Sequence, residues 1–310
     1  MQPSARGRRL TVGCGIALAF AMPIGLAACG DDDDKKSTKA AAKVVATPLA
    51  ITTSDAGAKR FSTQAPDSIK GGLVELTFTN AGKSLHEAQL IRIDGSHTAK
   101  EAIDVQTDET GAPIPDWFHA AGGVSGAPGQ TAKATMNLAA GTYAMIDNAN
   151  GQAPGPSNAA LGALAEFEVT AGENGALPPS TATITGATDA QAKPEHSFEI
   201  EGDLKVGNNR LRFVNEGEEL HHAIMFPINP GKSLADVTKA FSEEGPPSGP
   251  PPVDFEGAAG TAVIDGDTEF VTDVAIGKPG KYAVVCFLTN RDGKGKEHLA
   301  EGMIDEVVVK

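Results

Sequence analysis

Apolar and polar residues alternate along several short stretches of the chain. In one stretch Val74, Leu76 and Phe78 alternate with polar side chains, and in another Leu211 and Phe213 alternate with arginines. A period of two directs successive side chains to opposite faces of a strand, so one face of each stretch can be buried. Glycine- and proline-containing segments separate these stretches. The pattern predicts an all-β fold of short antiparallel strands packed as a sandwich.

This pattern occurs twice along the chain. The segment VELTFTNAGKSLHEAQLIRI (74–93) is similar to RLRFVNEGEELHHAIMFPI (210–228), and both contain Phe-x-Asn-x-Gly followed by Leu-His. Farther along, AGTYAMID (140–147) is similar to PGKYAVVC (279–286). We therefore predict two tandem β-sandwiches, which we call the first copy and the second copy.

Each copy also contains one segment with the signature of a short helix. Thr98-x-x-Glu101 and Ser233-x-x-Asp236 have the spacing of a capping box, in which two residues satisfy each other's backbone N–H groups at a helix start. After the second of these, apolar residues recur at helical spacing. The sequence therefore predicts one short helix in each sandwich.

The first residues are similar to a bacterial lipoprotein signal. Arg6, Arg8 and Arg9 precede an apolar run over 10–26, which matches the charged and hydrophobic regions of an export signal. The run ends in Leu-Ala-Ala-Cys29, which resembles the lipobox and implies cleavage before Cys29 and a diacylglyceryl group on its sulfur. We expect an exported protein whose lipid anchors it to the cell membrane on the extracytoplasmic side. The alternative is an ordinary signal peptide with a chance cysteine.

These observations divide the chain into five segments. The segment after Cys29 is charged and lacks apolar periodicity, so we interpret it as a flexible tether. A segment rich in glycine and proline separates the two copies. The predicted segments are a signal peptide (1–28), a tether (29–46), the first copy (47–170), a linker (171–180) and the second copy (181–310).

The chain is strongly acidic. It has 26 basic and 40 acidic residues and a net charge of −14, and removal of a signal peptide with three arginines would change this to −17. Such a charge argues against nucleic acid as a partner and against charge-driven binding to anionic lipids. A basic protein partner is compatible with it.

One cysteine is left without a role after export. Cys14 would be removed with the signal and Cys29 would be acylated, so Cys286 has no partner for an intrachain disulfide. An exposed thiol in an oxidising compartment is open to oxidation and to mixed disulfides. We therefore expect Cys286 to be either buried as a small apolar residue or occupied by a ligand.

Cys286 belongs to a pattern of soft metal ligands. His298 and Met303 follow it as Cys-x11-His-x4-Met, and His221 lies upstream. A thiolate, two imidazoles and a weakly held thioether are the ligands of a blue-copper electron-transfer site. Thiolate and thioether stabilise Cu(I), and imidazole suits both oxidation states.

Two adjacent histidines compete for the upstream position. On a strand His221 and His222 would face opposite sides, and the apolar residues around them do not decide which side is buried. The repeat decides, because His221 aligns with His86 of the first copy whereas His222 aligns with Glu87. We predict His221 as the ligand.

At these residues the chain resembles the cupredoxins, most closely plastocyanin-like and azurin-like proteins. The family pattern Gly-x-Tyr-x3-Cys is present at 280–286, and His-x4-Met with a glycine before the methionine is present at 298–303. The resemblance implies Greek-key β-sandwiches, with one type 1 copper ion in the second copy and one-electron transfer to or from an unidentified redox partner protein. The ligands that it implies are His221, Cys286, His298 and Met303.

The segment 287–297 departs from the family pattern. Eleven residues separate the cysteine and the second histidine, which is longer than usual for the family, and the segment is mostly polar with two glycines. We expect this loop to bulge outward and to position His298 less firmly. Its charged residues also suggest a docking mode that differs from the apolar patch of the family; they are Arg291, Asp292, Lys294 and Lys296.

The first copy lacks most of this ligand pattern. The positions of Cys286, His298 and Met303 are occupied there by Asp147, Asn158 and Ala163. We therefore expect no blue copper in the first copy. It is either a structural unit that covers or orients the second copy, or a zinc or type 2 copper site of His86 and Asp147 with His119.

Other functions find less support in the sequence. His97, His196 and His222 are expected at the surface or in loops. The sequence contains no HExxH, phosphate loop or nucleophile elbow, and no His-x-His pair of the kind that multicopper oxidases need, so we do not expect an enzyme. The alternatives to an electron carrier are a metal-free binding or structural lipoprotein with the same fold, and a copper capture or delivery protein with the same ligands.

Overall fold

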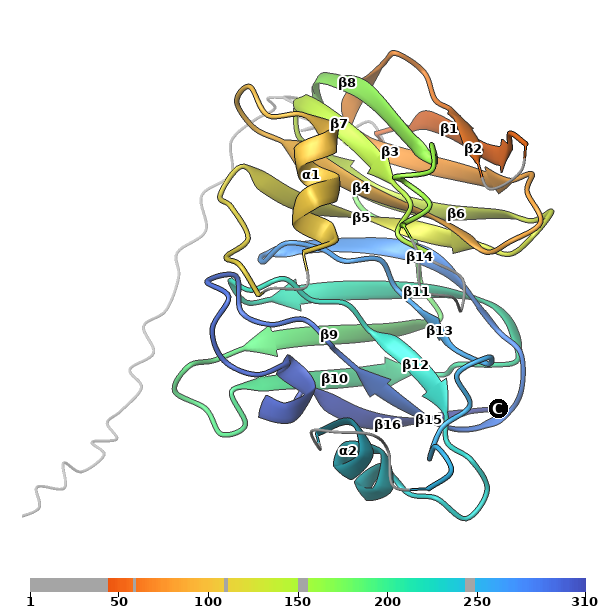
Figure 1. Ribbon diagram of the computed structural model, residues 1–310, viewed down its shortest axis with the longest axis vertical. Helices are drawn as coiled ribbons and strands as arrows, with labels where there is room; N and C mark the ends of the chain where they lie inside the picture. Colours follow the sequence, from red (N-terminus) through yellow and green to blue (C-terminus); the bar gives the residue numbers. More distant parts are fainter. Residues whose placement is uncertain (1–43, 58–59, 109–110, 150–155, 243–248) are drawn as a thin grey trace, which may run out of the picture. The chain divides into compact units, whose positions relative to one another are not determined.

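The computed structural model describes most of the chain after the predicted tether (Figure 1). The predicted signal peptide and Cys29 lie outside the described residues. Within the described part, no helix combines the length and the hydropathy needed to cross a membrane. The described ranges are 44–57, 60–108, 111–149, 156–242 and 249–310.

The strands of the first copy form two sheets. In one sheet β1 pairs with β2 and, in parallel, with β3, which also pairs with β6. The other sheet has the order β8-β7-β4-β5, and the first residues of β3 join it through β8. The strands are β1 (Thr47–Asp55), β2 (Phe61–Gln64), β3 (Ser68–Asn80), β4 (His86–Ile93), β5 (Phe118–Gly126), β6 (Thr131–Leu138), β7 (Gly141–Ile146) and β8 (Leu164–Glu173).

The second copy repeats this strand order. One sheet is β10-β9-β11-β14, with β9 and β11 parallel as β1 and β3 are, and the other is β13-β12-β15-β16. The predicted all-β fold of two sandwiches is therefore confirmed. The strands are β9 (Ala182–Thr188), β10 (His196–Gly202), β11 (Gly207–Glu216), β12 (Ile224–Pro227), β13 (Ala259–Gly260), β14 (Thr268–Ile276), β15 (Gly280–Val285) and β16 (Ile304–Val309).

Both predicted helices are present and begin as their sequences indicate. Before α1 (Ala99–Gln106), Thr98 and Glu101 form the complete capping box. Before α2 (Leu234–Ser242), the Ser233 N–H donates to Asp236 Oδ2 at 2.8 Å and the Asp236 N–H donates to Ser233 Oγ at 3.3 Å. These reciprocal bonds satisfy N–H groups that the first turn of a helix leaves free.

A tyrosine fixes the strand that leads to the predicted ligand position in each copy. The buried Tyr143 of β7 donates its hydroxyl hydrogen bond to Ala139 O at 3.1 Å, and the buried Tyr282 of β15 donates to Lys278 O at 2.8 Å. This link to a carbonyl a few residues upstream is a known corner-stabilising device of β-sandwiches. It holds the start of each strand, and Cys286 directly follows β15.

The two copies are joined through one edge of their sheets. β14 pairs antiparallel with β6, with Phe270 opposite Met136 and Thr272 opposite Ala134, and Figure 1 shows the two strands side by side. A single cluster of buried apolar side chains includes Phe78 of the first copy and Phe213 of the second. The copies therefore share backbone hydrogen bonds and an apolar core.

Candidate metal centre

The structure brings together strand ends that are far apart in the sequence. His221 lies between β11 and β12, Cys286 follows β15, His298 begins the 3-10 helix η1 (His298–Glu301), and Met303 precedes β16. All four residues are fully buried. The expectation of a buried Cys286 is confirmed, and this thiol is free.

Three donor atoms face one another at the centre of this group. Cys286 Sγ lies 3.6 Å from His298 Nδ1 and 3.8 Å from His221 Nδ1, and the two Nδ1 atoms are 3.1 Å apart. Around a metal with nitrogen ligands at about 2.0 Å and sulfur at about 2.3 Å, near-tetrahedral angles separate two nitrogens by ~3.2 Å and nitrogen from sulfur by ~3.6 Å. The observed separations therefore fit donors that share one metal ion, and the soft thiolate with two imidazoles suits copper.

Met303 is held against these donors by its backbone. Its N–H donates to His298 O at 2.8 Å, and the Cys286 N–H donates to Met303 O at 3.2 Å. Gly302 ends η1 with a left-handed φ of 115°, and a Cβ there would lie 2.0 Å from Pro194 Cβ. Both conditions favour glycine, which explains the glycine before the methionine.

Gly186 of β9 leaves room for the methionine side chain. A Cβ at this position would come within 2.7 Å of Met303 Cε and 3.5 Å of His221 Cβ. Gly186 pairs with Asn215 in the same register in which Thr53 pairs with Asn80 in the first copy. The first copy thus combines Thr with the small Ala163, and the second copy combines Gly with Met303.

Asparagine side chains hold the loops that carry the upstream histidines. Asn215 Nδ2 donates to Glu219 O at 2.8 Å, just before His221, and Asn80 Nδ2 donates to Ser84 O at 2.8 Å, just before His86. The repeated Asn of the Phe-x-Asn-x-Gly motif therefore has the same role in both copies: it shapes the turn that delivers a histidine.

The outer nitrogen of each histidine has a hydrogen-bond partner. His298 Nε2 lies 3.0 Å from Asn290 Oδ1, which can only accept, and His221 Nε2 lies 2.9 Å from Thr188 Oγ1. Asn290 Oδ1 places the proton of His298 on Nε2, and the Thr188 hydroxyl can accept from His221 Nε2 in the same way. With both protons on Nε2, the Nδ1 lone pairs are directed at the shared centre. Such outer contacts orient metal-binding histidines and set their tautomer.

His196 is also buried beside the centre, so its predicted surface position is wrong. Its ring stacks on that of His298 with centroids 4.0 Å apart, and its Nδ1 lies 3.0 Å from Thr188 Oγ1. The hydroxyl of Thr188 can thus accept from His221 and donate to His196. In the sequence, the alternation of His196 and Phe198 with exposed neighbours on β10 would have indicated burial.

Two candidate donor sets overlap at this centre. Among the described residues, His196, His221 and His298 have ring nitrogens within 4.8 Å of one another. The set with Cys286 is tighter, and each of its nitrogens points at the shared centre. His196 instead lies flat on the ring of His298 with its Nδ1 engaged by Thr188, so we assign it as a neighbour of the centre.

The other two histidines that were expected at the surface or in loops, His97 and His222, lie outside the centre. His97 is exposed and stacks on Trp117. The half-buried His222 accepts a 3.1 Å hydrogen bond from the Phe287 N–H at its Nε2. His222 therefore does not take part in the donor group that His221 joins.

Burial keeps the three donors uncharged in the absence of metal. Desolvation, aided by the neighbouring histidines, lowers the pKa of His221 to about 3 and that of His298 to about 2. Desolvation raises the pKa of the Cys286 thiol to about 12. The imidazoles can therefore bind a metal without losing a proton, whereas the thiol must release one to bind as thiolate.

The loop 287–297 is docked onto the first copy through Arg291, while Asp292, Lys294 and Lys296 are exposed. The guanidinium of Arg291 donates to Pro115 O at 3.2 Å, to Phe118 O at 3.1 Å and to Asp265 Oδ1 at 2.7 Å. The Ile114 N–H donates in turn to Arg291 O at 2.8 Å. The first copy thus anchors the loop that also supplies the Asn290 contact to the centre.

The corresponding place in the first copy is closed by a direct contact. His86 Nδ1 lies 2.5 Å from Asp147 Oδ2, both side chains are fully buried, and Asn158 Nδ2 lies 3.3 Å from Asp147 Oδ1. Burial raises the pKa of Asp147 despite this histidine. The third suggested ligand, His119, instead contacts Asp94 and Asp265 at 3.0 and 2.8 Å. The structure therefore does not assemble the suggested three-residue site.

Comparisons with known proteins give only distant structural likenesses. No protein-family model matches it, and no curated protein matches it in sequence. Similar solved structures include a multicopper oxidase (18% identity over 85% of this chain and 88% of that chain, TM-score 0.24) and auracyanin A, a "blue" copper protein from Chloroflexus aurantiacus (17%, 41% and 98%, TM-score 0.26). A third is the copper-containing nitrite reductase from Thermus scotoductus SA-01 (12%, 85% and 61%, TM-score 0.23). At TM-scores this low the likeness carries no argument, and the case for a metal centre depends on the geometry of Cys286, His221 and His298.

Proposed function

We propose that this protein binds one copper ion at the Cys286 centre and carries single electrons between partner proteins. The observation that supports this most directly is the convergence of Cys286 Sγ and two histidine Nδ1 atoms at 3.1–3.8 Å. Bound copper would supply a one-electron couple between Cu(II) and Cu(I). His221, Cys286, His298 and Met303 are the proposed ligands.

The residues around the centre would keep its geometry the same in both oxidation states. Thr188 and Asn290 orient the two imidazoles, and the hydrogen bonds between Cys286, Met303 and His298 tie the ligand backbones together. All four ligand side chains are shielded from water. A site that is assembled before the electron arrives has little to rearrange when the charge changes.

Copper capture or delivery is a second candidate that uses the same donors. An electron carrier should retain copper through repeated reduction and oxidation, whereas a delivery protein should give up Cu(I) readily to a chelator. We favour the carrier because the ligands are fully buried and the loop that covers them is anchored by Arg291. A catalytic role is less favoured, because the sequence has no His-x-His pair.

The proposed location is the extracytoplasmic face of the membrane, with a lipid on Cys29. This part of the proposal depends on the lipobox-like sequence alone. It predicts that the wild-type chain fractionates with membranes and that Cys29→Ser releases it from them. Membrane association that is unaffected by Cys29→Ser would contradict the lipid anchor.

Copper binding is tested on the full chain by titration with Cu(II). We expect an intense blue thiolate-to-copper absorption band and narrow copper hyperfine splitting in the electron paramagnetic resonance spectrum. Cys286→Ser should abolish the band, whereas His97→Ala, which changes an exposed histidine, should leave it intact. A colourless protein whose thiol reacts freely would overturn the proposal.

A further inference from the structure

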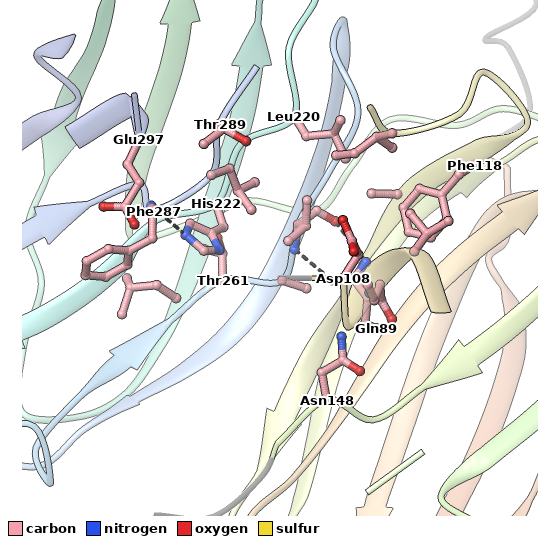
Figure 2. Close-up of a pocket in the computed structure, with 18 of the residues that line it drawn as sticks. Gln89, Asp108, Phe118, Asn148, Leu220, His222, Thr261, Phe287, Thr289 and Glu297 are labelled. Carbon is pink, nitrogen blue, oxygen red and sulfur yellow. Dashed lines mark hydrogen bonds between the residues drawn. The ribbon is translucent and has the colours of Figure 1, made fainter. Parts of the chain in front are cut away.

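A cavity of about 620 Å³ lies beside the metal centre, between residues of the two copies (Figure 2). Gln89, Phe118 and Asn148 line it from the first copy, and His222 and Phe287 line it from the second. Sites for small organic molecules commonly have volumes of roughly 300–1,000 Å³. This cavity is therefore large enough for such a molecule.

Part of the cavity wall is apolar and aromatic. Phe118 and Phe287 contribute rings, and Ile114, Leu220 and Ile224 contribute aliphatic surface. Such a wall favours a ligand with an apolar, preferably aromatic, body, because contact with it removes apolar surface from water.

The polar groups of the first copy offer acceptors that lack donors. Gln106 Oε1 and Asn148 Oδ1 are buried and have no hydrogen-bond partner among the described residues, and both residues line the cavity. The half-buried Glu87 accepts a hydrogen bond from the Asn148 backbone N–H, and desolvation, together with nearby Asp147, raises the pKa of Glu87 to about 7. Buried acceptors without donors are costly, and a ligand with N–H groups would satisfy them.

The charges of the lining have one sign. Glu87 and Glu297 contribute carboxyl groups, and no lysine or arginine is among the described residues that line the cavity. A cation near these carboxyl groups would be stabilised by them, whereas an anion would be repelled.

We propose that this cavity binds a small arylalkylamine. Its ammonium group lies at Glu87, Gln106 and Asn148, and its ring lies against Phe118 and Phe287. Each part of this ligand matches one property of the wall: the amide acceptors of Gln106 and Asn148, the carboxyl groups of Glu87 and Glu297, and the aromatic surface. Ring faces also attract cations, which adds to the preference for an amine.

The cavity is connected to the metal centre through its wall. Phe287 follows Cys286, His222 follows His221, and the Phe287 N–H donates to His222 Nε2 at 3.1 Å. A molecule in the cavity would therefore contact His222 and Phe287, which directly follow two of the proposed metal ligands in the chain. In the copper-loaded protein we expect it to shift the visible spectrum; amine binding itself does not depend on copper.

The test uses the full chain without copper and isothermal titration calorimetry at pH 8, above the pKa of about 7 of Glu87. Benzylamine is the probe, and benzyl alcohol and phenylacetate are its neutral and anionic counterparts. We expect saturable one-to-one binding of benzylamine and at least tenfold weaker binding of the other two. Because no copper is present in this titration, its result does not depend on whether the protein binds copper. A failure of amine binding is therefore distinguished from a failure of copper binding.

Variants separate the cavity from the rest of the surface. Glu87→Gln should weaken benzylamine binding at least tenfold, whereas Glu199→Gln, which changes an exposed glutamate on β10, should not. Ala112→Trp, at the exposed edge of the cavity, should also weaken binding without touching Glu87. Absence of benzylamine binding, equal binding of benzyl alcohol, or equal affinities of the folded wild type and Glu87→Gln would overturn the proposal.

Discussion

The two copies place the same strand ends together and fill the space between them differently. In the first copy His86 Nδ1 meets Asp147 Oδ2 directly at 2.5 Å, whereas in the second His221 Nδ1 stays 3.8 Å from Cys286 Sγ. In the first copy, the histidine and the aspartate are therefore hydrogen-bonded to each other directly. The second leaves donors that face one another at the spacing of metal ligands.

The features that build the sandwich are shared by the two copies. The Asn-held turn and the tyrosine corner occur in both copies, so these features serve the fold. Cys286, His298 and Met303 have counterparts of other chemistry in the first copy, a pattern that fits a function held by the second copy alone. The fold places side chains at the ends of the strands, and the chemistry of these side chains determines what the site can do.

The largest expected effect comes from giving the second copy the chemistry of the first. Cys286→Asp should abolish the blue band, because a hard carboxylate replaces the soft thiolate that would make the copper blue. The introduced carboxylate should pair with His221 as Asp147 pairs with His86. Absorption spectroscopy after Cu(II) addition measures the loss. A blue band that persists in this variant would show that Cys286 is not a ligand.

The converse change should create a second site. Asp147→Cys, Asn158→His and Ala163→Met supply the missing donors, and Thr53→Gly makes room for the methionine as Gly186 does in the second copy. We expect the bound copper to rise from one to two equivalents per chain, measured by metal analysis after removal of free ion. The same variant without Thr53→Gly is the control and should bind the second ion less tightly. If both variants bind only one equivalent of copper per chain, the four ligand residues alone do not account for the difference in copper binding between the copies.

Removal of the imidazole from the first copy should cost folding stability rather than copper. His86→Ala leaves the buried Asp147 carboxyl without its partner, and breaking a buried pair in this way typically costs about 3–5 kcal/mol of unfolding free energy. Urea denaturation measures this loss, and the blue band of the folded variant should be unchanged. His97→Ala, which removes an exposed pair with Glu101 and a stacked contact with Trp117, should cost about 1 kcal/mol or less. A comparable loss in both variants would mean that the buried pair does not stabilise the first copy.

Loss of the Arg291 contacts should loosen the centre without removing a ligand. Arg291→Ala frees the loop 287–297 from the carbonyls of Pro115 and Phe118, so Asn290 should hold His298 less well. Loss of outer contacts of this kind typically lowers metal affinity by about 10–100-fold. Competition with a copper chelator measures the change. Lys294→Ala alters an exposed side chain of the same loop and should have no effect; an equal effect of the two variants would argue against a specific anchor.

How far the sequence predicts this molecule depends on the range of the contacts. Strands, capped helices and the duplication follow from local patterns, and Tyr-x3-Cys with His-x4-Met marks the centre because β15 and η1 are close in the sequence. His196 was missed because its nearness to His298 arises from the packing of β10 against η1, which periodicity on a single strand does not reveal. The role of Arg291 was missed for a similar reason, since two of its acceptors, the carbonyls of Pro115 and Phe118, lie more than 170 residues away.

The smallest expected effect tests the size match between Gly186 and Met303. Gly186→Ala puts a Cβ 2.7 Å from Met303 Cε, the free end of a flexible side chain, so the methionine can shift while the fold is retained. We expect a stability loss of about 1 kcal/mol, at the low end for an overpacked core. Because a displaced thioether stabilises Cu(I) less, the reduction potential should fall while the blue band remains. Gly277→Ala is the matched control, since a Cβ there meets nothing within 4 Å and Gly277, like Gly186, does not have a left-handed φ. A potential unchanged by Gly186→Ala would mean that Met303 is core packing in the second copy, as Ala163 is in the first.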